Sequence, residues 1–179
     1  MSLKSTREFV MQQKLFSIRD KVYVMDINKN KIGVFNAKLI SIGKNYKLYD
    51  IADEQNAILT VKEKVVSMRS TYSFYKGDKD ELIGKLKAKI ISIKPKYWFE
   101  DPDKNKLFTM KGNLWKLKYE ILQEDKPVAE ISQKLFKIKG TYGVRIDPGL
   151  DDDSAMLVLG IVVMLHNEKE EQKKKNRNR

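Results

Sequence analysis

Apolar and polar positions alternate along this chain in a pattern that recurs at a nearly constant interval. A five-residue apolar phrase, usually introduced by lysine, begins at residues 14, 38, 64, 89, 113 and 134, at steps of 24, 26, 25, 24 and 21 residues. A tyrosine follows each phrase: Tyr46, Tyr72, Tyr97 and Tyr142 lie eight residues after its first residue, Tyr119 lies six after and Tyr23 nine after. Such self-similarity indicates an internal repeat in which one structural unit is written six times.

Each unit is predicted to contain two β-strands. The phrases and the tyrosine segments are rich in β-branched and aromatic residues, which favour strands. Between them lie clusters of Asn, Asp, Gly and Pro, the residues that form turns, at positions 28–30, 53–56, 77–80, 101–105 and 124–127. Six units of this kind predict about twelve strands.

A second pattern occupies residues 155–165, which are apolar on every side of a helix. Such a helix must be surrounded by protein or lipid, and it is shorter than the roughly 20 residues that cross a bilayer. We therefore expect a buried core helix over about 152–166, with capping oxygens before it and His166 and Lys169 near its other end. Its structural apolar positions include Ala155, Leu157, Leu159, Val162 and Leu165.

The two patterns together predict a mainly β fold: an antiparallel barrel of about twelve strands, closed around the C-terminal helix, because the lumen of so large a barrel exceeds what its own side chains fill. With 179 residues, 41% of them hydrophobic, the chain can form one such core. We assign residues 9–167 to a single barrel, 1–8 to an N-terminal extension partly derived from cloning, and 168–179 to a charged tail, either an exposed extension of the helix or a disordered end. The absence of cysteine is consistent with a reducing cytoplasm.

The repeated phrases, their six-fold spacing and the closing segment 142–152 before the apolar helix resemble the LURP-one-related proteins, whose fold is similar to the tubby C-terminal domain and the phospholipid scramblases. The resemblance covers roughly residues 9–167 and implies a β-barrel threaded by the C-terminal helix. It implies much less about activity, since one fold hosts many functions.

Catalytic and metal-binding signatures are scarce in the sequence. His166 is the single histidine and has no cysteine partner, so no catalytic constellation or cofactor is expected, and we predict a protein that is not an enzyme. Asp101, Asp103 and Asn105 begin like a calcium loop, but Lys106 replaces its glycine, which favours a hairpin turn. Residues 151–153 (Asp151, Asp152 and Asp153) are interpreted as helix caps, with a calcium site as the alternative.

Charge is the remaining clue to function, because the formal net charge is +12. The candidates for anion binding are Lys85, Lys87 and Lys89, which alternate along one predicted strand and so share a face, and Lys94 and Lys96, which follow closely. Outer-face lysines commonly serve only solubility and prevent strand pairing between molecules. The functional alternative, by resemblance to tubby-type domains, is recognition of anionic lipid head groups.

The sequence therefore favours a cytoplasmic, non-catalytic binding or scaffold module, peripheral at an anionic membrane surface or bound to a protein partner. A calcium-responsive, scramblase-like protein is the alternative, and the end of the apolar run at Leu165 weighs against a membrane-spanning anchor. Nucleic acid is a weaker candidate, since the aromatic residues of segment 97–99, flanked by Lys94 and Lys96, are explained first by core packing.

Overall fold

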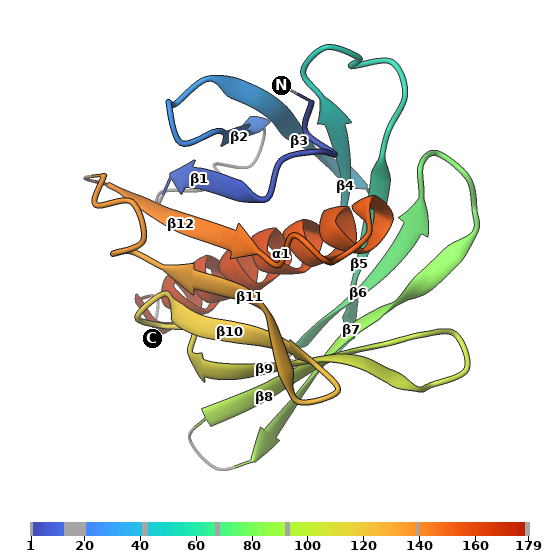
Figure 1. Ribbon diagram of the computed structural model, residues 1–179. Helices are drawn as coiled ribbons and strands as arrows, with labels where there is room; N and C mark the ends of the chain where they lie inside the picture. The colour runs from blue at the N-terminus through green and yellow to red at the C-terminus, as the bar shows by residue number, and fades with distance from the viewer. Residues whose placement is uncertain are drawn as a thin grey trace.

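A computed structural model describes residues 2–12, 21–40, 43–66, 69–91, 94–138 and 140–177 (Figure 1). Within these residues the chain forms twelve strands followed by one helix: β1 (Glu8–Gln12), β2 (Lys21–Met25), β3 (Lys31–Ile40), β4 (Gly43–Asp50), β5 (Leu59–Val66), β6 (Arg69–Lys76), β7 (Leu82–Ile91), β8 (Lys94–Glu100), β9 (Lys106–Asn113), β10 (Lys118–Gln123), β11 (Lys126–Ser132), β12 (Thr141–Ile146) and α1 (Asp152–Arg177).

The strands form a closed barrel in which each strand pairs with its neighbour in sequence and β1 pairs with β12. Every pairing is antiparallel, and the closing pair is in register from Glu8 with Arg145 to Gln12 with Thr141. Closure leaves no free sheet edge for another chain to extend. The predicted fold, a mainly β barrel of twelve antiparallel strands with a C-terminal helix, is confirmed.

The repeated phrases mark one end of three hairpins. Ile40 pairs with Gly43, Val66 with Arg69 and Ile91 with Lys94, so three phrases end in connections of the same length. The fifth and sixth phrases differ, because residues 114–117 form a turn after β9 and residues 133–138 follow β11 without forming a strand. The first phrase, residues 14–18, lies outside the described residues.

The helix α1 runs through the barrel with strands around it (Figure 1). Its residues from Ala155 to Lys169 are buried, including all of the apolar positions expected to form the core. The predicted end near residue 166 is wrong, since the helix continues to Arg177. His166 is consequently not a helix-end residue: it is fully buried, and its ring stacks on Tyr142 at a centroid separation of 4.9 Å.

The N-terminal residues also pack more closely than expected of an extension. Leu3 is fully buried and belongs to the core cluster. Its backbone N–H donates to Asp50 Oδ2 at 3.0 Å, and the Leu3 side chain fills the space above Gly33, where a Cβ would approach it to 2.7 Å. Leu3 therefore closes part of the barrel near the start of β3 and the end of β4.

Candidate functional site

The anion-binding candidates on β7 and β8 whose side chains the structure describes lie on the outer face of the barrel wall. Lys85 and Lys89 are exposed, whereas Leu86 between them is buried, as alternation along a strand requires. On the neighbouring strand, Lys96 is exposed and pairs directly with Lys89. Two ammonium groups thus stand opposite each other across the hairpin, an arrangement that is destabilising unless an anion lies between them.

Lys87 has a different environment from the lysines beside it. Its ammonium group forms an ion pair with Glu100, and the other carboxylate oxygen of Glu100 accepts a hydrogen bond from Trp98 Nε1 at 3.1 Å. The hydrogen bond from Lys87 holds the pKa of Glu100 below its ordinary value. Lys87 is therefore already neutralised within the protein, and the side chain of Lys94 lies outside the part of the chain that the structure describes.

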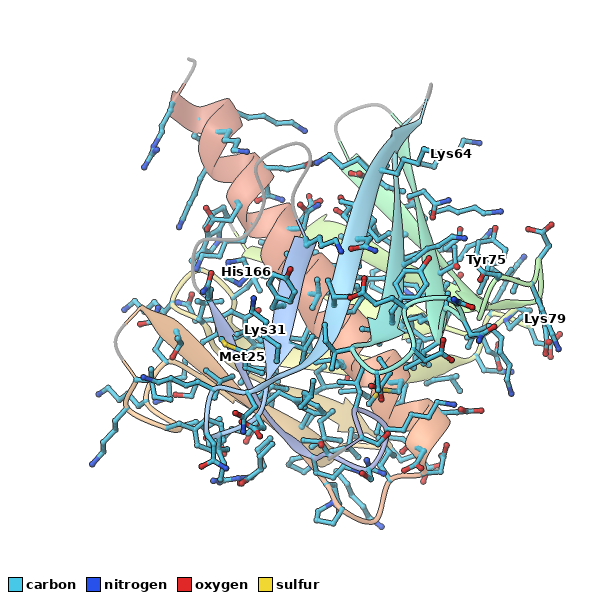
Figure 2. The ribbon with its side chains drawn as sticks, turned by 90° about the horizontal axis from the view of Figure 1, so that it is seen from above. Met25, Lys31, Lys64, Tyr75, Lys79 and His166 are labelled. Atoms are coloured by element: carbon cyan, nitrogen blue, oxygen red, sulfur yellow. The ribbon has the colours of Figure 1, made fainter. Side chains whose placement is uncertain are left out.

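The neighbouring strands extend this charged surface. Figure 2 shows Lys64 of β5 and Tyr75 of β6 turned away from the helix. Lys62 Nζ lies 4.5 Å from the centroid of the Tyr75 ring and 3.0 Å from Asp80 Oδ1. Among the described residues, four lysines of β5, β7 and β8 have no carboxylate within 4.0 Å, and we name them the basic patch: Lys64, Lys85, Lys89 and Lys96.

The acidic residues before α1 contact separate partners. Asp151 caps the helix, since its Oδ1 accepts a hydrogen bond from the N–H of Ser154 at 2.9 Å, and this hydrogen bonding lowers the pKa of Asp151. Asp152 pairs with Arg7 at 2.6 Å and Asp153 with Lys76 at 3.0 Å. Over the residues that the structure describes, no cluster of three or more acidic, histidine or cysteine side chains has a geometry suited to a metal ion.

A family model of LURP-one-related proteins matches residues 7–166, which include every strand of the barrel and most of its buried helix. The chain belongs to the LURP-one-related family. The X-ray structure of a protein from Arabidopsis thaliana is similar over 90% of this chain and 91% of that one, with a TM-score of 0.62 and 15% sequence identity. At this identity the likeness shows the fold alone. No curated protein matches.

The LURP-one-related barrel also contains a buried polar network that the sequence did not predict. Asn167 Nδ2 donates to Tyr46 Oη at 3.0 Å and lies 3.4 Å from Tyr72 Oη, while Tyr72 donates to Glu168 at 3.1 Å. The hydroxyl of Tyr46 lies 3.4 Å from Glu63, which is also buried. Burial, together with the nearby carboxylates, raises the pKa of both phenols. These contacts connect the polar part of α1 to β4 and β6 directly, and to Glu63 of β5 through Tyr46.

The cavities lined by described residues of this LURP-one-related protein include two with polar groups in their walls. One, of about 810 Å³, lies near the start of α1; its polar lining includes Asp50, Asp78 and Asp153, which are already hydrogen-bonded or paired. The other, of about 380 Å³, lies between the beginning of β8 and the end of β9 and reaches Leu165 of α1. We name it the lateral slot. No pattern in the sequence predicts this slot, because it depends on where the pairing of β8 with β9 stops.

None of the helices in the described ranges is long and apolar enough to span a membrane. The helix of this LURP-one-related protein has its apolar part enclosed by its own strands instead.

Proposed function

We propose that this LURP-one-related protein is a non-catalytic binding module that attaches to anionic phospholipid surfaces through its basic patch. The observation that supports the proposal most directly is the pair Lys89 and Lys96, exposed and directly opposite each other on β7 and β8. A lipid phosphate or carboxylate placed between them would relieve the repulsion of two adjacent ammonium groups.

The composition of the surface supports an anionic partner of low geometric specificity. The patch consists of lysines, which act as point charges, whereas a site built to grip one phosphate favours the bidentate arginine fork. The net charge of +12 attracts polyanions generally. Two half-buried aromatic rings nearby are covered by lysines, since Lys62 covers Tyr75 and Lys106 covers Trp98 at 5.3 Å, which leaves less ring surface for stacked bases and favours lipid over single-stranded nucleic acid.

Vesicle co-sedimentation tests the proposal with the double variant Lys89→Gln/Lys96→Gln. Each lysine near an anionic membrane contributes about 1 kcal/mol, so loss of two should weaken binding to phosphatidylserine vesicles by roughly thirtyfold. Raising the salt concentration should weaken the wild type in the same way. Thermal melting should be unchanged or higher, because the substitution removes a like-charge pair.

The matched control is Lys126→Gln/Lys134→Gln, which removes the same charge from exposed positions at the start of β11 and just beyond its end. This variant should retain most of the binding. Equal losses of vesicle binding in both double variants would show that only net charge matters, and would contradict a binding surface localised at the basic patch. Absence of wild-type binding to phosphatidylserine vesicles at moderate salt would reject the proposal, and tighter binding to a single-stranded oligonucleotide or to an acidic peptide would redirect it to those partners.

A further inference from the structure

The lateral slot exists because β8 and β9 pair over only part of their lengths, which leaves the beginning of β8 and the end of β9 unpaired with each other. Their register covers only Trp98 to Glu100 on β8 and Lys106 to Thr109 on β9. Before this stretch, Pro95 has no N–H to donate to a neighbouring strand. Beyond it, β9 remains paired with β10 through Gly112 and Asn113, so the wall opens on one side of β9 alone.

A glycine beside this opening lets β9 lie close against β10. Gly112 has φ of 127°, which favours glycine, and a Cβ there would come within 2.6 Å of the Cα of Tyr119 on β10. The backbone of β9 can therefore lie close against Tyr119, whose ring points into the barrel and is buried. The slot passes on the other side of β9, between β8 and β9, to Leu165 of the helix.

The lining of the slot has the chemistry of a small-molecule site. It is mainly apolar, with these side chains: Pro95, Tyr97, Met110, Leu114, Trp115 and Leu165. Its volume of about 380 Å³ lies within the ~300–1,000 Å³ typical of ligand pockets. Trp115, which belongs to this lining, is 40% exposed and so lies where the slot meets solvent.

Polar groups occur at two separate places in the slot. Lys111 and Lys118 line it from the outer face, and both are exposed. Tyr119 also lines the slot, and its hydroxyl is buried and has no hydrogen-bond partner among the described residues. A buried hydroxyl left unpaired is destabilising, and an oxygen atom supplied by a ligand would satisfy it.

We propose that the lateral slot binds an anionic amphiphile: a carboxylate that contacts Lys111 and Lys118 at the mouth, an aliphatic chain that packs on Leu114, Trp115 and Leu165, and an oxygen at the far end of the chain that accepts a hydrogen bond from Tyr119. The slot opens beside Lys96, but the inference does not rest on membrane attachment, because its ligand is a soluble monomer.

Calorimetric titration with decanoate and with ω-hydroxydecanoate, each below its micellar concentration, tests the proposal on the full chain. Both ligands should saturate one site, and the hydroxylated chain should bind about tenfold more tightly, as expected of one buried hydrogen bond. Tyr119→Phe should abolish that preference while leaving decanoate binding unchanged. The unliganded variant should be at least as stable as the wild type, because the substitution removes an unpaired hydroxyl.

Three further variants assign the remaining contacts. Leu114→Asp, at a half-buried position in the turn after β9, should abolish binding of both ligands. Lys111→Gln/Lys118→Gln should weaken the binding of both ligands by roughly thirtyfold, if each lysine contributes as much binding free energy as it does near an anionic membrane. Lys126→Gln/Lys134→Gln, the control of equal charge, should weaken neither.

The proposal is overturned if neither ligand saturates a site, or if Leu114→Asp leaves the titration unchanged. It is also overturned if the preference for the hydroxylated chain survives Tyr119→Phe, or if that variant is less stable than the wild type, since its hydroxyl would then already be satisfied inside the protein. None of these results bears on vesicle binding by the Lys89→Gln/Lys96→Gln variant, so the two proposals fail separately.

Discussion

At the scale of the residue, five of the six tyrosines that follow the repeated phrases lie in the core, and the sixth does not. Tyr46, Tyr72, Tyr97, Tyr119 and Tyr142, at spacings of eight or six residues, are all buried. Tyr23, at a spacing of nine, is only half-buried, and Lys31 Nζ lies 3.8 Å from the centroid of its ring. Because side chains alternate between the two faces of a strand, Tyr23 lies on the face opposite to that of its buried neighbours Val22 and Val24.

The same hydrogen-bond pattern recurs in two turns, where the carboxylate of an aspartate accepts hydrogen bonds from an asparagine four residues later. Asp26 accepts hydrogen bonds from the backbone and side chain of Asn30, both at 2.9 Å, and Asp101 accepts the equivalent bonds from Asn105 at 2.8 and 2.9 Å. The residue before each asparagine is a lysine with positive φ, at 67° and 69°. The hairpin turn expected at residues 101–105 is thus present. Within it, the carboxylate of Asp101 is occupied by hydrogen bonds from Asn105.

Replacement of Asp101 by alanine should lower the melting temperature at neutral pH, because Asn105 loses both acceptors. The hydrogen bond from the Asn105 side chain lowers the pKa of Asp101 below its ordinary value. A lowered folded-state pKa contributes stability above the unfolded-state pKa of about 3.9, and this contribution is lost as the pH falls through the folded-state value. The difference between wild type and variant should therefore shrink on acidification below about pH 4, as followed by thermal melts across a pH series.

Asp103→Ala is the control for this prediction, because Asp103 lies exposed in the same turn. It should change the melting temperature little, and its difference from wild type should not show the same loss on acidification. A drop equal to that of Asp101→Ala would indicate that the turn responds to any loss of charge and would contradict the hydrogen-bond explanation.

At the scale of the element, the sequence predicts strands and the start of the helix well because those depend on local patterns. The β-prone segments and the turn residues delimit the hairpins, and the apolar run with its Asp151 cap locates the start of α1. The end of α1 depends on distant partners: Asn167 and Glu168 are buried against Tyr46 and Tyr72, which are 121 and 96 residues away in the chain. Nothing in the local pattern near residue 166 identifies those partners.

The same limit applies to the candidate surface. Alternation along one strand predicts that Lys85, Lys87 and Lys89 share a face, and all three do lie at outward positions. Which of them is neutralised depends on contacts across the pair of strands: the register of β7 against β8 places Glu100 opposite Lys85 and Lys96 opposite Lys89, but the Glu100 carboxylate pairs diagonally with Lys87. The lateral slot depends likewise on where β8 and β9 separate, a property of paired strands rather than of either strand alone.

Val162→Asp tests the burial of the helix at one position, since Val162 is fully buried. An unpaired carboxylate there should lower the free energy of unfolding by several kcal/mol, a large part of the ~5–15 kcal/mol of a typical domain. Urea denaturation monitored by far-ultraviolet circular dichroism measures the change. Lys174→Asp, at an exposed position of the same helix, should alter stability by less than about 1 kcal/mol. Similar values for the two variants would contradict the enclosure of α1 by the strands.

At the scale of the whole molecule, barrel and helix form one core. The buried cluster combines side chains from every strand with those of α1 from Ala155 to Leu165. The helix packs so closely against β5 and β6 that a Cβ on Gly160 would lie 2.5 Å from Leu59 Cδ2 and 3.2 Å from the ring of Phe74. Strand pairing satisfies the backbone of the barrel, but the helix supplies the apolar surface that fills its lumen.

Truncation after Ser154 should therefore abolish cooperative folding, although every strand remains in the chain. The inward faces of the strands would surround a space far larger than the cavities that cores tolerate, and water or collapse would replace the lost contacts. We expect insoluble protein, or a state with retained far-ultraviolet and lost near-ultraviolet circular dichroism that binds a hydrophobic dye. Truncation after Lys173 is the matched control: it keeps Asn167, Glu168 and the Gln172 side chain that donates to Glu168 at 2.8 Å, so it should unfold cooperatively with nearly the wild-type midpoint. A sharp unfolding transition in the chain truncated after Ser154 would mean that the strands close into a barrel without the helix. The hypothesis that the barrel depends on the helix would then be wrong.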